Sequence, residues 1–283
     1  MPFLIGTDEA GYGPNYGPLC ICATVWEVDE GIDAACLYKK LRRSVTECVD
    51  RAAKRKIIWA DSKAVYKNGC GMDHLERGVL AALSLIERRP LHWHELWADV
   101  QHSPRPHNAT TIGRAPSNIA APIADECSAS EQSVATIALA AESSGVFAEL
   151  PWHLDFAATL PIWLGVADGP AWMSINAMSE LSDCIREALA AVGVRLVAIL
   201  CRALFPAEFN DLVAASNKAD VLSRATLGLV IDALQLISAG AVEVCCDKHG
   251  GRDYYLPLLQ SHIEDWIEVR RESELASQYR CQN

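Results

Sequence analysis

Hydrophobic residues recur along the chain with two different spacings, and these spacings predict strands that alternate with helices. Short apolar or alternating runs indicate strands, and they occur at residues 3–8, 18–27, 56–59, 195–204 and 242–246. Apolar residues three or four positions apart indicate helices, and the segments predicted to be helical are residues 33–50, 72–89, 171–192, 206–215 and 218–238. The last two strands are apolar almost throughout, so we expect both to be buried. This alternation is typical of an α/β fold.

The middle of the chain has a different character. Residues 91–170 hold seven of the 13 prolines, and proline interrupts both helices and sheets. One alanine-rich piece near residues 128–147 is predicted to be helical. We therefore interpret residues 91–170 as an insertion or lid-like subdomain on a single domain that spans residues 1–283.

Composition and charge narrow the class of protein. A hydrophobic content of 51% with 22% charged residues is typical of a globular protein, and no apolar run reaches the length of a membrane span. The first residues leave no room for a signal peptide, so we expect a cytoplasmic protein without a membrane partner. The net charge of −11 works against nucleic-acid binding, although Lys and Arg cluster locally at residues 39–43 and 51–56.

The 11 cysteines are expected to be reduced thiols. An odd number in a cytoplasmic chain argues against a disulfide framework, and the lack of a Cys-x-x-Cys pair argues against structural zinc. Thiols in apolar runs behave as small hydrophobic side chains, and the cysteines in such runs are Cys20, Cys22, Cys201, Cys245 and Cys246.

Candidate chemistry is concentrated at the end of the first predicted strand. Residues 8–18 read Asp-Glu-Ala-Gly-Tyr-Gly-Pro-Asn-Tyr-Gly-Pro. The adjacent carboxylates of Asp8 and Glu9 are suited to a divalent cation, and the glycines after them let a phosphate backbone approach closely. A simple polar turn is the alternative for an isolated Asp-Glu pair, but the full eleven-residue pattern favours a site.

A third acid follows the last predicted strand. Asp247 comes directly after residues 242–246, and a His249-Gly250-Gly251 turn comes next. Because ligands bind at the carboxyl ends of the strands in an open α/β sheet, we expect Asp247 to meet Asp8 and Glu9 there. The alternative for Asp247 is to cap the turn. His249 is expected to face solvent rather than to bind metal or phosphate.

The motif of residues 8–18 resembles the signature of the type 2 ribonucleases H, the ribonuclease HII and HIII family. It matches the family at every diagnostic position except Tyr12, where the family has Arg. Three further segments resemble the family and occur in the same order, at residues 60–63, 205–211 and 244–247. The resemblance covers residues 1–70 and 195–255, whereas residues 91–170 have no counterpart in it.

The resemblance implies a ribonuclease H-like mixed sheet flanked by helices, and a metal-dependent endonuclease that hydrolyses RNA in RNA–DNA duplexes. It implies Mg²⁺ or Mn²⁺ bound by Asp8, Glu9 and Asp247, since paired metal ions activate a water and stabilise the leaving oxygen. Backbone groups of the glycine turn would contact the ribose 2′-hydroxyl, which distinguishes RNA from DNA. The residues implied in substrate binding are Gly11, Tyr12, Gly13, Asp61 and Lys63.

The chain departs from the family towards its C-terminal end. The family has a fourth acid at the start of a late helix, and no such helix is predicted here. Among the acids that follow Asp247 we choose Asp265 as the candidate fourth catalytic residue, in preference to Asp253, Glu268 and Glu272.

Alternatives therefore stay open for the function and for two of the substrate contacts. The chain could be a catalytically impaired protein that binds nucleic acid or a protein partner. It could also be a metal-dependent hydrolase of another phosphoester, because a fold does not fix a substrate. For Asp61 the alternative role is a helix N-cap, and for Lys63 it is a surface charge.

Overall fold

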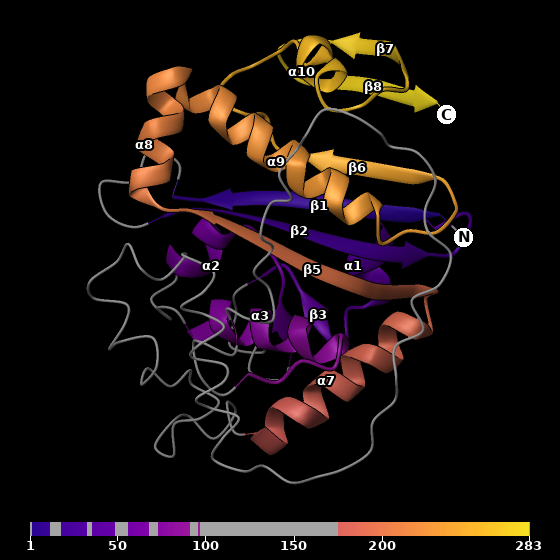
Figure 1. Cartoon of the computed structure of the whole chain (residues 1–283). Helices are drawn as coiled ribbons and strands as arrows, with labels where there is room; N and C mark the ends of the chain where they lie inside the picture. Colours follow the sequence, from indigo (N-terminus) through magenta and orange to yellow (C-terminus); the bar gives the residue numbers. More distant parts are fainter. Residues whose placement is uncertain are drawn as a thin grey trace, which may run out of the picture.

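A computed structural model of the chain describes residues 2–11, 18–32, 36–48, 56–67, 73–90, 96 and 175–282. Its centre is a four-stranded sheet with the strand order β5-β2-β1-β6 (Figure 1). The strands are β1 (Phe3–Ala10), β2 (Leu19–Val28), β5 (Val194–Leu204) and β6 (Val242–Cys246). β2 runs antiparallel to both β1 and β5, whereas β6 runs parallel to β1. The fold is therefore mixed α/β, with a mixed sheet flanked by helices.

One face of the sheet is covered by helix α9 (Lys218–Leu234), and α8 (Pro206–Ala215) adds to the same core. Alternate residues of a strand point to the same face, and Ile5 of β1 and Ile21 of β2 are fully buried here against Leu222 of α9. α9 begins after Asn217, whose side chain accepts a hydrogen bond from the backbone N–H of Asp220 at 3.0 Å. This core fixes the sheet from which the site is built.

The opposite face of the sheet packs against helices α3 (Asp73–Leu85) and α7 (Ile175–Ala190). Trp26 of β2 points to this side and packs with Ile185 of α7 in a second core. The Arg186 guanidinium donates a hydrogen bond to the backbone carbonyl of Ser84 at 2.7 Å, which joins the two helices. Four short elements complete this side, namely α1 (Leu37–Lys40), β3 (Val45–Thr46), β4 (Ile57–Ile58) and α2 (Ser62–Lys67).

The C-terminal part forms a small unit of its own beside β6, drawn in yellow in Figure 1. It consists of helix α10 (Leu256–Gln260) and an antiparallel hairpin of β7 (Trp266–Glu272) and β8 (Ser277–Gln282). The ammonium group of Lys248 donates to the carbonyls of Ser273 at 2.8 Å and Glu274 at 2.6 Å. These bonds hold the hairpin against the segment that follows β6.

Most of the predicted elements are confirmed to within a few residues, but two predictions are wrong. Residues 33–50 do not form one helix, because the described part has only the four-residue α1 before β3. The β-branched pair Val45 and Thr46 favours extended backbone, and Val45 is buried opposite Ile57 of β4. β6 is not buried either, since it lies at the edge of the sheet and residues 243–246 are exposed.

Two further outcomes concern the middle and the end of the chain. The predicted insertion at 91–170, with its alanine-rich piece, lies outside the described residues apart from Leu96. The spacing of hydrophobic residues predicts neither α10 nor the β7–β8 hairpin.

The packing of α9 on the sheet gives a stability prediction. Leu222→Ala should lower the free energy of unfolding by about 2–5 kcal/mol, because it leaves a cavity in a fully buried position. Leu236→Ala is the matched control, since Leu236 is 54% exposed, and its effect should stay within about 0.5 kcal/mol. Urea denaturation measures both values. Equal losses in the two variants would contradict the placement of α9 over the sheet.

Candidate active site

The parallel pairing of β1 with β6 brings the two acidic segments together. In the register of the two strands, Thr7 lies opposite Cys246. The next residue of each strand is an acid, Asp8 on one and Asp247 on the other. Both acids therefore lie at the carboxyl ends of adjacent parallel strands, which is where α/β sheets bind their ligands.

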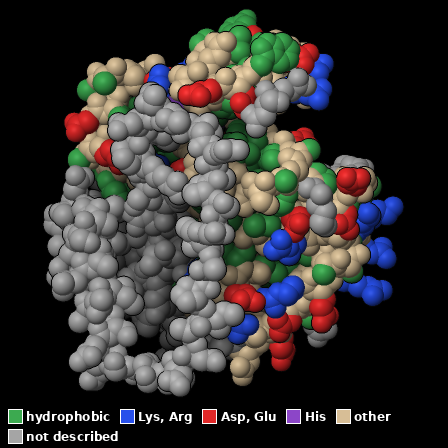
Figure 2. Space-filling view, turned by 45° about the vertical axis from the view of Figure 1, so that its right-hand side comes forward, with side chains coloured by type: hydrophobic (Ala, Val, Ile, Leu, Met, Phe, Trp, Pro, Cys, Tyr) green, Lys and Arg blue, Asp and Glu red, His purple; other side chains and the backbone are tan. Residues whose placement is uncertain are grey.

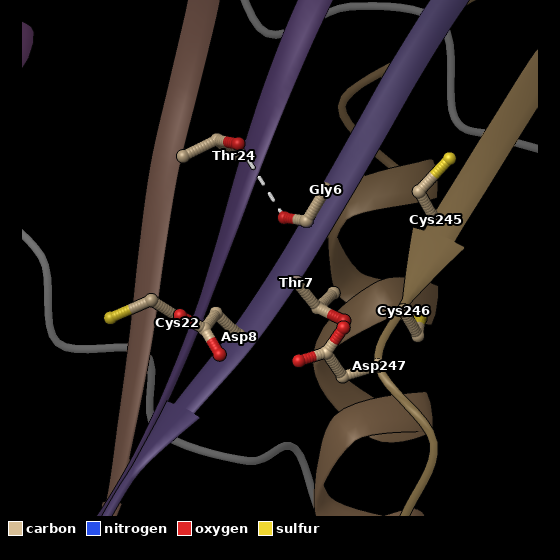
Figure 3. Close-up of a pocket in the computed structure, with 8 residues that line it drawn as sticks. All are labelled: Gly6, Thr7, Asp8, Cys22, Thr24, Cys245, Cys246 and Asp247. Carbon is tan, nitrogen blue, oxygen red and sulfur yellow. Dashed lines mark hydrogen bonds between the residues drawn. The ribbon is translucent and has the colours of Figure 1, made fainter. Parts of the chain in front are cut away.

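Asp8 and Asp247 line one pocket, which is open to solvent and has a volume of about 370 Å³. Figure 3 shows the carboxyl group of Asp8 on the Cys22 side of β1 and that of Asp247 on the other side of β1, beside Thr7. The rest of the lining consists of Gly6, Thr7, Thr24 and three thiols, those of Cys22, Cys245 and Cys246. The backbone N–H of Glu9 donates to Asp8 Oδ1 at 2.9 Å, which fixes one oxygen of that carboxylate.

The charges of Asp8 and Asp247 both affect the pKa of Glu9. Its pKa is raised above the ordinary value, first by burial and then by the negative charges of Asp8 and Asp247. The positive charge of Lys63 and the hydrogen bond of the Glu9 backbone oppose this rise in the pKa. Consecutive residues of a strand point to opposite faces, so Glu9 shares its face with Thr7 rather than with Asp8. Three carboxylates and one ammonium group thus act on each other at this edge.

The donor chemistry of the site fits a hard divalent cation, because Mg²⁺ and similar ions prefer carboxylate oxygens. The mutual repulsion that raises the pKa of Glu9 is also what a bound cation would relieve. Among the described residues, however, no group of three or more His, Cys, Asp or Glu side chains lies close enough together to hold a metal ion. Asp8 and Asp247 are the two acids that face the shared pocket.

The glycine turn is described only at its two ends. Gly11 has a φ of +82°, and a Cβ atom there would lie 2.6 Å from the carbonyl oxygen of Pro18. A side chain at this position would therefore collide with the backbone, and glycine is required. Tyr12 and Gly13 lie outside the described residues, so their expected substrate contacts stay predictions.

Asp61 and Lys63 lie at the start of α2. Asp61 Oδ1 accepts a hydrogen bond from the backbone N–H of Ala64 at 3.0 Å, which is the geometry of an N-cap. The capping alternative for Asp61 therefore holds, and its contact with substrate stays a prediction. Lys63 is exposed and its charge acts on Glu9, so a positive group stands beside the acidic edge.

Asp265, the candidate fourth acid, belongs to the C-terminal hairpin. It directly precedes β7, and its charge adds to the effect of burial in raising the pKa of Cys281 on β8. It does not line the pocket of Asp8 and Asp247. The three acids weighed against Asp265 have other partners: Asp253 pairs with Lys248, Glu268 with Arg270, and Glu272 with the Tyr279 hydroxyl.

His249 was expected to face solvent, and this prediction is wrong, since its side chain is 3% exposed. Its Nδ1 is hydrogen-bonded to Ser223 Oγ of α9 at 3.1 Å, and its backbone N–H donates to the Tyr255 hydroxyl at 2.9 Å. Burial and the charge of Arg252 lower the pKa of His249, against the opposing effect of Asp247. The segment that starts at Asp247 is therefore anchored to α9. The sequence contains one indication that His249 is buried. Ser223 is a polar residue on the core-facing side of a predicted helix, where it needs a hydrogen-bond partner.

The cysteines around the site differ in their surroundings. All nine cysteines within the described residues are free thiols. Cys22, Cys245 and Cys246 are exposed, so the prediction that they act as small core residues is wrong. Cys245 and Cys246 lie on the edge strand β6, and Cys22 lines the open pocket. Cys201 is buried, and a hydrogen bond between the thiols of Cys22 and Cys201 lowers the pKa of Cys22 and raises that of Cys201.

Comparisons with known proteins do not place the chain in a family. No protein-family model matches it, and neither does any curated protein or solved structure. Within the described residues, no helix is both long and apolar enough to cross a bilayer. The function therefore has to rest on the chemistry of the site and on the resemblance of the motif.

The raised pKa of Glu9 gives a prediction about stability. Glu9→Gln should raise the melting temperature at neutral pH in the presence of a chelator, because the amide carries no charge to be buried or repelled. A raised pKa in the folded state means that folding favours the protonated acid. The penalty of the charge is therefore absent well below the ordinary pKa of 4.5 and complete once the pH exceeds the folded value.

Thermal unfolding of both proteins at acidic and neutral pH measures this effect. The difference in melting temperature should be present at pH 7 and vanish as the pH falls below 4.5. Glu30→Gln is the control, because Glu30 is an exposed acid in the turn after β2. A Glu9→Gln melting temperature equal to or below that of the wild type at pH 7 would refute this account of the site.

Proposed function

We propose that the protein is a metal-dependent endonuclease of the type 2 ribonuclease H kind, which hydrolyses the RNA strand of RNA–DNA duplexes. One observation carries the proposal. Acids from distant parts of the sequence, Asp8 and Asp247, line one pocket at the ends of adjacent parallel strands. The motif that contains Asp8 is the segment that resembles the family most closely.

Each described residue of the site has a role in this proposal. Asp8, Glu9 and Asp247 would hold Mg²⁺ or Mn²⁺, which activates a water for attack and stabilises the leaving oxygen when it is bound. Gly11 would hold the turn in the shape that the motif requires, because its positive φ and the nearby Pro18 carbonyl leave no room for a side chain. Lys63 supplies a positive charge beside Glu9, where a phosphate of the substrate would gain from it.

Binding of a polyanion by a chain with a net charge of −11 requires local positive charge. Figure 2 shows Lys and Arg side chains in separate groups with Asp and Glu among them. One group is exposed on and just after α1 and consists of Lys39, Lys40, Arg42 and Arg43. Such a group can bind the phosphate backbone away from the acidic edge, and it would make the affinity strongly dependent on salt.

A second candidate function is a ribonuclease H-like protein that binds hybrids but does not cleave them. It is favoured by the lack of a three-ligand metal cluster among the described residues. The position of Asp265 outside the pocket also favours it, because the family uses a fourth acid. Salt-sensitive binding of a hybrid without turnover would identify this alternative.

Cleavage of an end-labelled RNA–DNA hybrid in Mg²⁺ or Mn²⁺ tests the proposal. The wild type should cleave the RNA strand, and Asp8→Asn should lower the rate by about 100- to 1,000-fold. The reason is that bound metal supplies several kcal/mol of transition-state stabilisation, and about 1.4 kcal/mol corresponds to tenfold in rate.

Two further variants complete the test. Asp247→Asn should behave like Asp8→Asn, whereas Asp183→Asn on α7 should cleave as the wild type does. Asp183 is a suitable control because it belongs to α7 and does not line the pocket. Its ion pair with Arg186 is exposed, so its loss should change stability little. Absence of cleavage by the wild type in either metal, or full activity of Asp8→Asn, would refute the proposed nuclease.

A further inference from the structure

Cys22 and Cys201 lie directly opposite each other on neighbouring strands. In the antiparallel register of β2 and β5, the partner of Cys22 is Cys201, and the pair lies before the irregularity that follows Val25. Both cysteines are free thiols. On its other side Cys22 lies opposite Asp8 of β1, so the thiol pair is next to the candidate active site.

The spacing of this pair suits a disulfide bond. Directly opposite residues of antiparallel strands have Cα atoms about 4.5 or 5.5 Å apart, depending on the type of pair. Both values fall within the range of about 4.4–6.8 Å that disulfides span. The Cβ atoms of such a pair are about 4.5–5.5 Å apart, at or beyond the upper end of the disulfide range. A bond formed here would therefore be somewhat strained, and strained disulfides are readily reduced.

The two thiols differ in their exposure to solvent, and an oxidant would therefore reach one of them first. Cys22 is exposed and lines the pocket, whereas Cys201 is buried with an exposed fraction of 5%. Figure 3 shows the sulfur of Cys22 on the side away from Asp8. An accessible thiol next to a buried one is the arrangement in which the first is oxidised and the second resolves the product.

We propose that Cys22 and Cys201 are an oxidation site, at which a peroxide or a small disulfide converts the two thiols into a reversible disulfide bond. With hydrogen peroxide, the sulfur of Cys22 attacks one oxygen, the O–O bond breaks, and a sulfenic acid and one water form. The sulfur of Cys201 then attacks the sulfur of Cys22, the S–O bond breaks, and a second water leaves. The two thiols lose two electrons and two protons, and the peroxide is reduced to two waters.

The strand register excludes the neighbouring cysteines from the same reaction. Cys20 lies on the same face of β2, two residues before Cys22, but its partner on β5 is Ala203. It is therefore diagonal to Cys201, at about 7–8 Å, which is too far for a disulfide without movement of the backbone. Cys245 and Cys246 belong to β6, which β1 separates from β2, so they lie two strands, or about 10 Å, from Cys22.

Peptide mapping of the oxidised full-length protein tests the proposal without reference to its proposed nuclease activity. The reduced protein is treated with hydrogen peroxide or oxidised glutathione, its remaining thiols are alkylated, and it is digested without reductant. Mass spectrometry should find one linked pair of peptides that carries Cys22 and Cys201, and dithiothreitol should abolish it. Alkylation of Cys22 should fall correspondingly after oxidation.

Three variants make the assignment specific. Cys20→Ser is the matched control and should keep the link, whereas Cys22→Ser should lose it. Cys201→Ser should lose the link and leave Cys22 as a sulfenic acid that a dimedone probe traps. Cys201 is buried, so its replacement could disturb folding. Loss of the link in Cys22→Ser, at an exposed position, is therefore sufficient to test the assignment. Alkylation of both Cys22 and Cys201 after oxidation, or a link between Cys20 and Cys201, would overturn the proposal.

Discussion

The pairing of β1 with β6 is the contact on which the candidate site depends. It joins residues 3–7 to residues 242–246 in parallel register, although more than half of the chain lies between them. Parallel strands need a long connection, and here that connection includes the helices α3, α7, α8 and α9, which pack against the sheet. The central sheet is therefore the scaffold that allows Asp8 and Asp247 to share one pocket.

The site concentrates like charges at a place where the fold can tolerate them. Burial and the repulsion between these charges raise the pKa of Glu9, and the charge of Lys63 and a backbone hydrogen bond oppose the rise. The pocket lies at an exposed sheet edge, so water screens Asp8 and Asp247, while the buried residues behind them hold the strands in place. Carboxylates that repel one another are suited to bind a cation, because its positive charge offsets their repulsion.

The sequence predicts most of the sheet, because the signals for its strands are local. The run that ends at Asp8 and the helix around Leu222 each have a clear apolar spacing. The exposure of β6 and the burial of His249 could not be predicted, since both depend on which elements become neighbours. An apolar run does not distinguish an edge strand from a central one, and His249 is buried only because Ser223 of α9 offers a partner.

We propose, as the central claim, that Asp8, Glu9 and Asp247 bind a cation near the carboxyl ends of β1 and β6. Anomalous X-ray scattering from crystals soaked in Mn²⁺ tests this claim most directly. The account predicts a strong manganese peak in the pocket, with carboxylate oxygens of Asp8 and Asp247 among its ligands. Manganese bound only elsewhere on the protein, with none beside Asp8, would contradict it.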